Sequence, residues 1–302
     1  MYIKKHDNCR VCGGRLEPFL DLPLRHIEGA FLTSSNSVIP TRKESNKICL
    51  CTGECKLVQS DTEIPQDILY SSYFYRSNIN EMMRKHLSEL ADKAKSYFQD
   101  DKNHTIIDIG GNTGFFLDQF NKKWKKINID PSNVAQNCNS NITVINKCFP
   151  CEIPNVMSAE IISCIAAFYD FADPSLGMQK ISQKLIRNGI IIIEFAYLVD
   201  ILQKLAYDEL VFEHLNHYSF SCFNYIIEKY GLKIFDCYRN SINGGSLQLW
   251  LCHSFFNDYD TPEGKERIRQ IKVKEFNLEL DRIEVYNQFR YDVEQHSHKL
   301  RV

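Results

Sequence analysis

The sequence lacks any long hydrophobic run, and its charges almost cancel. No apolar stretch approaches the ~18 residues of a membrane-spanning helix, and the polar residues 1–7 lack the apolar segment of a signal peptide. The formal net charge of -2 offers no basic surface for nucleic acid. The one basic run, at residues 122–126, is typical of a solvated helix end. These absences predict a cytoplasmic protein that has neither nucleic acid nor a membrane as a partner.

The remaining totals describe an ordinary soluble chain with one unusual count. At 302 residues, with 44% hydrophobic and 25% charged residues, it can bury a sizeable core, and its length suggests about two domains. The unusual count is that of the cysteines, of which there are 12. In a reducing compartment, so many cysteines argue for metal ligands and buried thiols rather than for a disulfide framework.

Five of the cysteines form two clusters near the N-terminus. Cys9 and Cys12 belong to a C-x-x-C-G knuckle, and Cys49, Cys51 and Cys55 follow in the second cluster. The chain between them has too little apolar material for a core of its own, and a zinc ion held by four thiolates would supply the missing stability. Free cysteines without a metal are the alternative. We predict a zinc-binding module over residues 1–68 with structural zinc on Cys9, Cys12, Cys51 and Cys55, where Cys49 is the substitute for Cys51.

A glycine-rich turn at residues 110–114 separates two apolar runs. The pattern around it indicates a buried strand, a tight turn and then a helix. Asp130 follows 20 positions after Gly110, where an acidic residue suits the two hydroxyls of a ribose. The spacing D-x-G-x-x-x-G differs from the dinucleotide pattern and resembles the S-adenosylmethionine (SAM) loop of class I methyltransferases. We predict that SAM is contacted by Asp108, Gly110, Asn112, Gly114, Asp130 and Pro131.

Strand and helix patterns alternate through the middle of the chain. Near-continuous apolar runs are expected of parallel strands that are covered on both faces. Five such runs lie at 106–109, 127–129, 143–145, 161–164 and 190–194, and two later strand patterns lie at 233–238 and 247–252. By resemblance to methyltransferases, we predict an α/β class I SAM-methyltransferase fold over residues 69–255. Its Rossmann-like sheet would have seven strands, mostly parallel, with a late antiparallel pair.

Two further segments flank the predicted sheet. Residues 70–86 begin with aromatic and hydroxyl side chains and run into a helix. These tyrosines either pack on the nucleotide domain or form a lid that presents Tyr73, Tyr75 and Ser77 to a ligand. Near the end of the chain, Thr261 and Pro262 suit a helix start, and apolar residues then recur at spacings of three and four. We predict one long amphipathic helix over residues 256–302, whose apolar stripe packs on the body or on a second subunit.

Two polar segments follow the fifth predicted strand. Glu213 and His214 lie beyond its carboxyl end, where parallel sheets place their ligand crevice. A histidine beside a carboxylate has the pKa range of a general base, although a histidine satisfied by backbone groups is the alternative. The turn at residues 243–246 is either a plain hairpin connection or, where it faces the crevice, a set of ligand contacts.

The motifs, taken in order, resemble the sugar C-methyltransferases that act on nucleotide-linked 4-keto-deoxyhexoses. The match covers almost the whole chain, at the zinc knuckle, residues 55–59, 73–77, His86, the glycine loop, 129–132, 194–197, 213–214 and 244–247. The resemblance implies that His214 removes the C3 proton, which the neighbouring keto group acidifies, and that the enolate takes the methyl group of SAM. It implies that Glu213 orients His214 or binds the sugar, and that Tyr75 holds the substrate. The other implied substrate contacts are Tyr73, Ser77, Asp170, Tyr197, Asn243, Gly245 and Ser246.

Three departures from the family pattern shape the competing predictions. The family usually has a tyrosine where Val211 stands, and it commonly has a histidine where Asp170 aligns. We also expect the family's C-terminal domain to be missing after Val302, in a natural short form or a piece of a longer protein. A homodimer or a partner would then supply that domain. The alternatives are a sugar O-methyltransferase or a non-catalytic SAM-binding partner subunit. An NAD-dependent enzyme ranks third, because the dinucleotide glycine pattern is incomplete.

Overall fold

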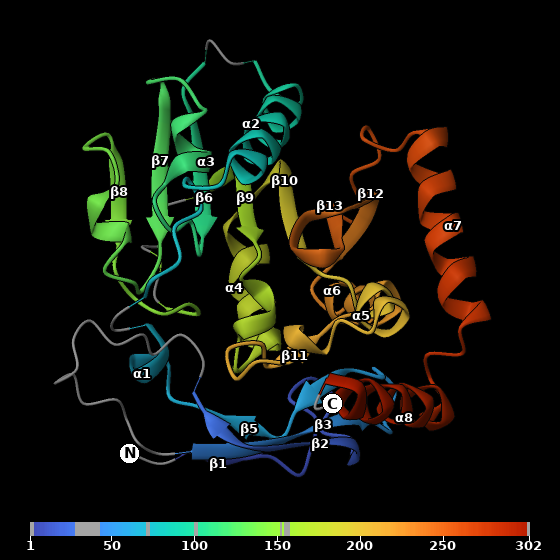
Figure 1. Cartoon of the computed structure of the whole chain (residues 1–302). Coiled ribbons are helices and arrows are strands. Elements are labelled where there is room, and N and C mark those ends of the chain that lie inside the picture. Colours follow the sequence, from blue (N-terminus) through green and yellow to red (C-terminus); the bar gives the residue numbers. More distant parts are fainter. Residues whose placement is uncertain are drawn as a thin grey trace, which may run out of the picture.

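The computed structural model describes residues 3–27, 43–70, 73–99, 102–151, 153 and 158–300. These residues form a seven-stranded sheet, a four-stranded sheet and a two-stranded ribbon. Figure 1 shows the parallel strands of the large sheet running down toward the small sheets, so that their carboxyl ends face the N-terminal module. None of the helices in the described part of the chain has the length and hydropathy of a membrane span.

The large sheet contains all seven strands that the apolar runs predict. They are β6 (His104–Ile109), β7 (Trp124–Ile129), β8 (Ile142–Ile145), β9 (Ala159–Ile165), β10 (Leu185–Ala196), β12 (Leu232–Asn240) and β13 (Ser246–His253). Their order is β12-β13-β10-β9-β6-β7-β8. The five strands from β6 to β10 pair in parallel, and β13 runs antiparallel between β10 and β12. The predicted α/β methyltransferase fold is confirmed.

Helices cover both faces of this sheet, which explains why its strands are apolar without alternation. Successive side chains of a strand point to opposite faces. Accordingly, Ile107 and Ile162 lie in one core cluster with helices α4 (Pro174–Lys184) and α6 (Phe220–Glu228). Ile106 and Ile161 lie in a second cluster with α2 (Glu81–Lys95) and α3 (Phe115–Asp118). The shorter helices are α1 (Gln66–Tyr70), α5 (Leu198–Lys204), η1 (Ala135–Asn137), η2 (Phe168–Asp170), η3 (Tyr207–Glu209) and η4 (Ile242–Gly244).

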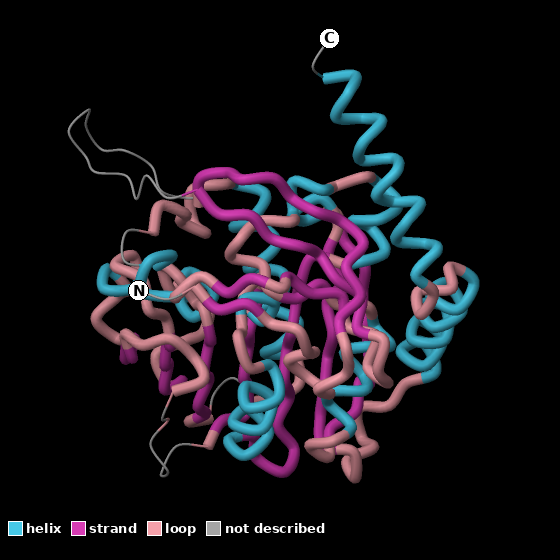
Figure 2. Tube along the Cα trace, turned by 90° about the horizontal axis from the view of Figure 1, so that it is seen from below, coloured by secondary structure: helices cyan, strands magenta, loops and turns pink. Residues whose placement is uncertain are grey.

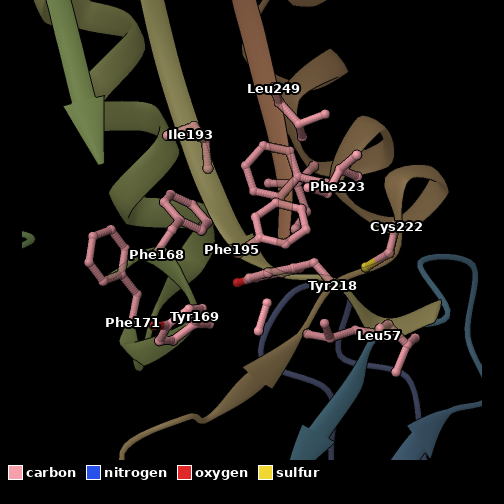
Figure 3. Close-up of a cluster of buried hydrophobic side chains, with 14 of the residues drawn as sticks. Leu57, Phe168, Tyr169, Phe171, Ile193, Phe195, Tyr218, Cys222, Phe223 and Leu249 are labelled. Carbon is pink, nitrogen blue, oxygen red and sulfur yellow. The ribbon is translucent and has the colours of Figure 1, made fainter. Parts of the chain in front are cut away.

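The N-terminal module shares both a sheet and a core with the rest of the chain. Its strands are β1 (Lys4–Lys5), β2 (Leu16–His26), β3 (Lys43–Cys51), β4 (Val58–Ser60) and β5 (Thr62–Glu63). The fourth strand of its sheet is β11 (Asn216–His217), which comes from far along the chain and pairs antiparallel with β4. Figure 3 draws Leu57 of the module in one buried cluster with Tyr218 and Phe223. The module therefore completes its core with residues of the large domain.

The C-terminal region contains two helices, so the prediction of one long helix is wrong. Helix α7 (Pro262–Asn277) begins at the expected cap, where the side chain of Thr261 accepts a hydrogen bond from the Gly264 amide. The chain then breaks, with Glu279 at φ 51°, and α8 (Ile283–Leu300) follows. The break changes the helical phase, which leaves Phe276 of the predicted stripe 82% exposed. Helix α8 packs on β2, where the ring centroids of Tyr286 and Phe19 lie 4.9 Å apart. Figure 2 shows this C-terminal helix beside the strands of the N-terminal module.

Candidate active site and metal centre

The glycine loop lies at the carboxyl end of β6 and forms one wall of a pocket. Gly110 has φ +73°, and a Cβ atom there would lie 2.5 Å from the Cβ of Ala167. At Gly111, a Cβ atom would lie 2.6 Å from the Asp108 Oδ2. Only glycine fits so tight an approach, and the backbone conformation at Gly110 favours it as well. The loop therefore leaves its backbone open toward the pocket.

The pocket holds about 960 Å³ of space, part of it open to solvent. The cavity proper accounts for about 120 Å³ of this space. The predicted residues that line it are Tyr73, Tyr75, Ser77, Asp108, Gly110, Asn112, Asp130, Pro131 and Asp170. Sequence reasoning missed Tyr70 of α1 and the apolar wall formed by Ile129, Phe149, Ile165 and Phe171. These residues carry no motif, and only the fold brings them together.

Asp108 and Asp130, two of the three acidic residues that line the pocket in the described part of the chain, have different surroundings. Both oxygens of Asp130 accept hydrogen bonds. Oδ2 accepts from the backbone amide of Asn112 at 2.8 Å, and Oδ1 accepts from the backbone amide and the hydroxyl of Ser132 at 2.8 and 2.5 Å. Asp108 is buried more deeply, and the hydroxyl of Ser163 donates to its Oδ1 at 2.7 Å. Burial, together with the nearby charge of Asp130, raises the pKa of Asp108 to about 7. Asp108 is therefore partly protonated near neutral pH.

The segment from Tyr73 to Ser77 is fastened to the glycine loop by Asn112. The Asn112 side chain donates to the Tyr75 carbonyl and accepts from the Ser77 amide, both at 3.0 Å. The Ser77 and Thr113 hydroxyls are also 3.1 Å apart. All three predicted lid residues line the pocket, and Tyr75 is 39% exposed. The geometry thus fits a lid better than simple packing. The side-chain amide of Asn112 holds this segment against the glycine loop.

His214 and Glu213 lie beside the pocket but are not among the described residues that line it. His214 Nδ1 is 2.8 Å from the Glu209 carbonyl oxygen and 3.6 Å from its Oε2. A carbonyl oxygen can only accept, so Nδ1 carries the proton, and in neutral imidazole the lone pair is at Nε2. The group that contacts Nδ1 is therefore Glu209, while the expected roles of Glu213, orienting His214 or binding the sugar, stay predictions. The charge of Glu213 also acts on Tyr73 and Asp170, which do line the pocket.

Five predicted site residues lie away from the pocket. The Tyr197 hydroxyl is buried and donates to Glu275 of α7 at 2.7 Å. The hydroxyl of Ser246 donates to the Ile242 carbonyl at 2.9 Å, within the connection between β12 and β13. This connection lies two strands beyond β9, on the far side of β10, which favours the plain-hairpin alternative. The residues of this group are Gly114, Tyr197, Asn243, Gly245 and Ser246.

Four thiols of the N-terminal module form a candidate metal centre. The Sγ atoms of Cys9, Cys12, Cys51 and Cys55 all lie within 4.8 Å of one another. Tetrahedral zinc, with Zn–S bonds of about 2.3 Å, requires S···S separations of nearly this size. The two knuckles also approach closely, because a Cβ atom on Gly14 would lie 2.9 Å from the Gly53 Cα. Cys49 is buried outside the cluster, so the thiols that lie together are those of the first predicted ligand set and not of its substitute. With four protein ligands, the centre would be closed and structural.

Family models match all three parts of the chain. The model described as "Methyltransferase domain" matches residues 75–236, and "Putative zinc binding domain" matches residues 9–70. The model described as "C-methyltransferase C-terminal domain" matches residues 241–302. The expectation that this domain is missing is therefore wrong. Beyond the motif at residues 244–247, the pattern of this region predicts one amphipathic helix where the structure has two.

Individual relatives are distant. The chain is 22% identical to the C-methyltransferase NovU of Streptomyces niveus over 259 residues, which cover 82% of this chain and 61% of NovU. A solved structure of magnesium protoporphyrin IX methyltransferase from Synechocystis shares 11% identity, with a TM-score of 0.47, over 60% of this chain and 90% of that one. For the N-methyltransferase NodS of Bradyrhizobium japonicum, the identity is 12% and the TM-score 0.45, over 58% and 89%.

Proposed function

Because the chain belongs to the methyltransferase family whose domain spans residues 75–236, flanked by the zinc-binding and C-methyltransferase C-terminal parts, we propose that it is a SAM-dependent C-methyltransferase. We propose a nucleotide-linked 4-keto-deoxyhexose as its substrate, on the resemblance of its motifs. The observation that carries the proposal is the pocket itself. There the glycine loop and Asp130 face Tyr73, Tyr75 and Asp170.

The residues of the pocket fit SAM, and the four thiols fit zinc. Asp130 would accept hydrogen bonds from the ribose hydroxyls through its remaining lone pairs. Gly110 and Pro131 would contact the nucleoside, and the position of Gly110 has no room for a larger side chain. When bound, SAM supplies a methyl group on a sulfonium, which is already a strong electrophile. Zinc would hold the N-terminal module together and take no part in the reaction.

His214 is the proposed base that takes the C3 proton. The Glu209 carbonyl fixes its Nδ1–H, so that the basic lone pair of the neutral ring is on Nε2. Once protonated, the imidazolium would be stabilised by the Glu209 carboxylate 3.6 Å away. The substrate would extend from the pocket past Asp170 toward His214, and Tyr75 of the lid would hold it there. Positioning matters most in such a transfer, because reacting atoms must approach to about 3 Å.

Hydrogen exchange into the substrate tests the carbon-acid mechanism without methyl transfer. In deuterated water without SAM, the protein should exchange C3 hydrogen of nucleotide-linked 4-keto-deoxyhexoses for deuterium. His214→Asn should slow this exchange by about 10²–10⁴-fold, the usual contribution of a general base. His298→Asn on the exposed side of α8 is the matched control and should exchange normally.

Two alternatives make different predictions in the same experiment. A sugar O-methyltransferase, favoured by Val211 and Asp170 in place of the family's tyrosine and histidine, would methylate a hydroxyl and show no C3 exchange. A non-catalytic SAM-binding subunit would bind SAM in a calorimeter but leave sugar methylation unchanged in the His214→Asn variant. Absence of exchange with every 4-keto sugar, together with an O-methylated product, would rule out the proposed mechanism.

A further inference from the structure

Asp170 presents an unpaired carboxyl oxygen beside the pocket. It ends η2, shortly after the carboxyl end of β9, and it lines the same pocket as the glycine loop. Its Oδ1 is buried and has no hydrogen-bond partner among the described residues. The Tyr70 hydroxyl, from α1, hydrogen-bonds to the same carboxyl group. A buried polar atom without a partner is costly in a folded protein, so this oxygen is suited to a group that arrives with the ligand.

The surroundings of Asp170 favour the protonated carboxyl group. Its pKa lies well above the usual range, first because of burial and second because of the nearby charge of Glu213. The hydrogen bond from Tyr70 opposes this shift and is outweighed. The other titratable groups that feel its charge are Tyr73, Tyr169 and Cys164, which are neutral at neutral pH. Among the described residues, no positively charged side chain lowers the pKa of Asp170.

A neutral carboxylic acid has a hydrogen to donate, which a carboxylate does not. We propose that Asp170 is a neutral acid that donates a hydrogen bond to the substrate oxygen on which negative charge develops. This inference rests on the proposed function. When the C3–H bond breaks, the proton goes to His214 Nε2, the electron pair of that bond forms a C3=C4 double bond, and the π pair of the C4 carbonyl moves onto its oxygen. Asp170 keeps its proton and stabilises that oxygen, so that Asp170 and His214 act on opposite ends of the same enolate.

The protonation state can be measured without a substrate. Infrared difference spectra between the wild-type protein and Asp170→Asn at pH 7 should contain the carbonyl band of one protonated carboxylic acid. Asp108 contributes to both proteins, so the difference isolates Asp170. Asp21→Asn is the matched control, since the Asp21 side chain is 80% exposed and should give no such band. Where Asp170→Asn does not fold, Asp170→Ser provides the same difference. Glu213→Gln should lower the pH at which the band disappears.

The kinetic test uses two variants that separate hydrogen bonding from charge. Asp170→Ala should lower kcat for a 4-keto nucleotide sugar by about 10²–10³-fold, the usual loss of an oxyanion donor. Asp170→Asn keeps a neutral donor and should stay within roughly tenfold of wild type. It should also lose the decline in kcat that ionisation of Asp170 causes at high pH. SAM affinity, measured by calorimetry, should not change in either variant.

The two tests fail in distinguishable ways. A missing carboxylic acid band at pH 7 would contradict the inference, as would an Asn variant as impaired as the Ala variant. A band that is lost equally in Asp170→Asn and Glu213→Gln would indicate a proton shared between the two carboxyl groups, which also contradicts it. If the wild-type protein methylates no 4-keto sugar, the proposed function fails, while the infrared result still stands by itself.

Discussion

Asp108 lies near the carboxyl end of β6, where burial changes the pKa of its carboxyl group. Asp108 has a pKa of about 7 in the folded protein, raised by burial and by Asp130 from the usual 3.8. A raised pKa means that the folded state binds this proton more tightly than the unfolded chain does. The stability that this provides is complete below about pH 4 and is lost as the pH rises to about 7.

Replacing Asp108 with asparagine should remove this part of the pH dependence. Between pH 5 and pH 8, wild-type protein should lose about 2–3 kcal/mol of unfolding free energy through Asp108. In Asp108→Asn, the drop in unfolding free energy between pH 5 and pH 8 should be smaller by this amount. Urea unfolding at both pH values measures it. Asp92→Asn, in α2, where the Asp92 side chain is 74% exposed, serves as the control. Parallel pH profiles for wild type and Asp108→Asn would contradict the assignment.

Local spacing predicts some site residues, while others depend on distant contacts. The four cysteines and the pair Asp108 and Asp130 follow from short motifs whose geometry is set by the nearby backbone. Glu209 contacts His214 across a turn that has no recognisable motif, and Tyr70 reaches Asp170 from a part of the chain 100 residues away. Tyr197 was misplaced because its hydroxyl meets Glu275 on a helix whose position the sequence does not reveal.

At the scale of elements, Asn112 connects the lid to the glycine loop. Its side chain makes two hydrogen bonds to the segment that contains Tyr75 and Ser77. Asn112→Ala removes both, at about 1 kcal/mol each, and should weaken SAM binding by roughly tenfold. The Ser77 amide should also exchange its hydrogen faster. Asn78→Ala, on an exposed residue of the same segment, is the control and should bind SAM normally. Unchanged SAM affinity in Asn112→Ala would contradict the connection.

Strands were more predictable than the C-terminal helices. The central strands of the large sheet are buried on both faces, so each of them leaves an apolar run that is visible without any knowledge of partners. The C-terminal helices have a different signal. The spacing of Phe276, Leu280 and Ile283 continues the three-and-four pattern across residues 278–282, where the chain leaves the helix. The pattern therefore concealed the break, and only packing shows that the two helices cover different parts of the body.

At the scale of the whole molecule, the N-terminal module supports the segment that contains the proposed base. Strand β11, two residues after His214, is the edge strand of the module's sheet. The guanidinium of Arg25 in β2 lies 4.2 Å above the Phe212 ring and donates to the Leu210 carbonyl at 3.1 Å. The proposed SAM contacts, in contrast, lie at the carboxyl ends of β6 and β7. The module thus supports the proposed base more directly than the proposed cofactor site.

Loss of zinc should therefore affect deprotonation more than SAM binding. Cys12→Ser should release the metal, lower the melting temperature and slow C3 exchange by about tenfold or more. Residues that hold or support a metal typically change activity by that much when they are replaced. SAM affinity, measured by calorimetry below the melting temperature, should stay close to wild type. Cys49→Ser leaves the ligand set intact and should keep its zinc. Equal losses of SAM binding and C3 exchange in Cys12→Ser would contradict this division of tasks.

The most direct test of the proposed function is the position of the transferred methyl group. The protein is incubated with SAM that carries a ¹³C-labelled methyl group and with a panel of nucleotide-linked 4-keto-deoxyhexoses, and the products are examined by carbon NMR. We predict a product in which the labelled methyl group is bonded to C3 of the sugar and shows carbon–carbon coupling. A methyl group on oxygen, or no transfer to any 4-keto sugar by protein that binds SAM, would contradict it.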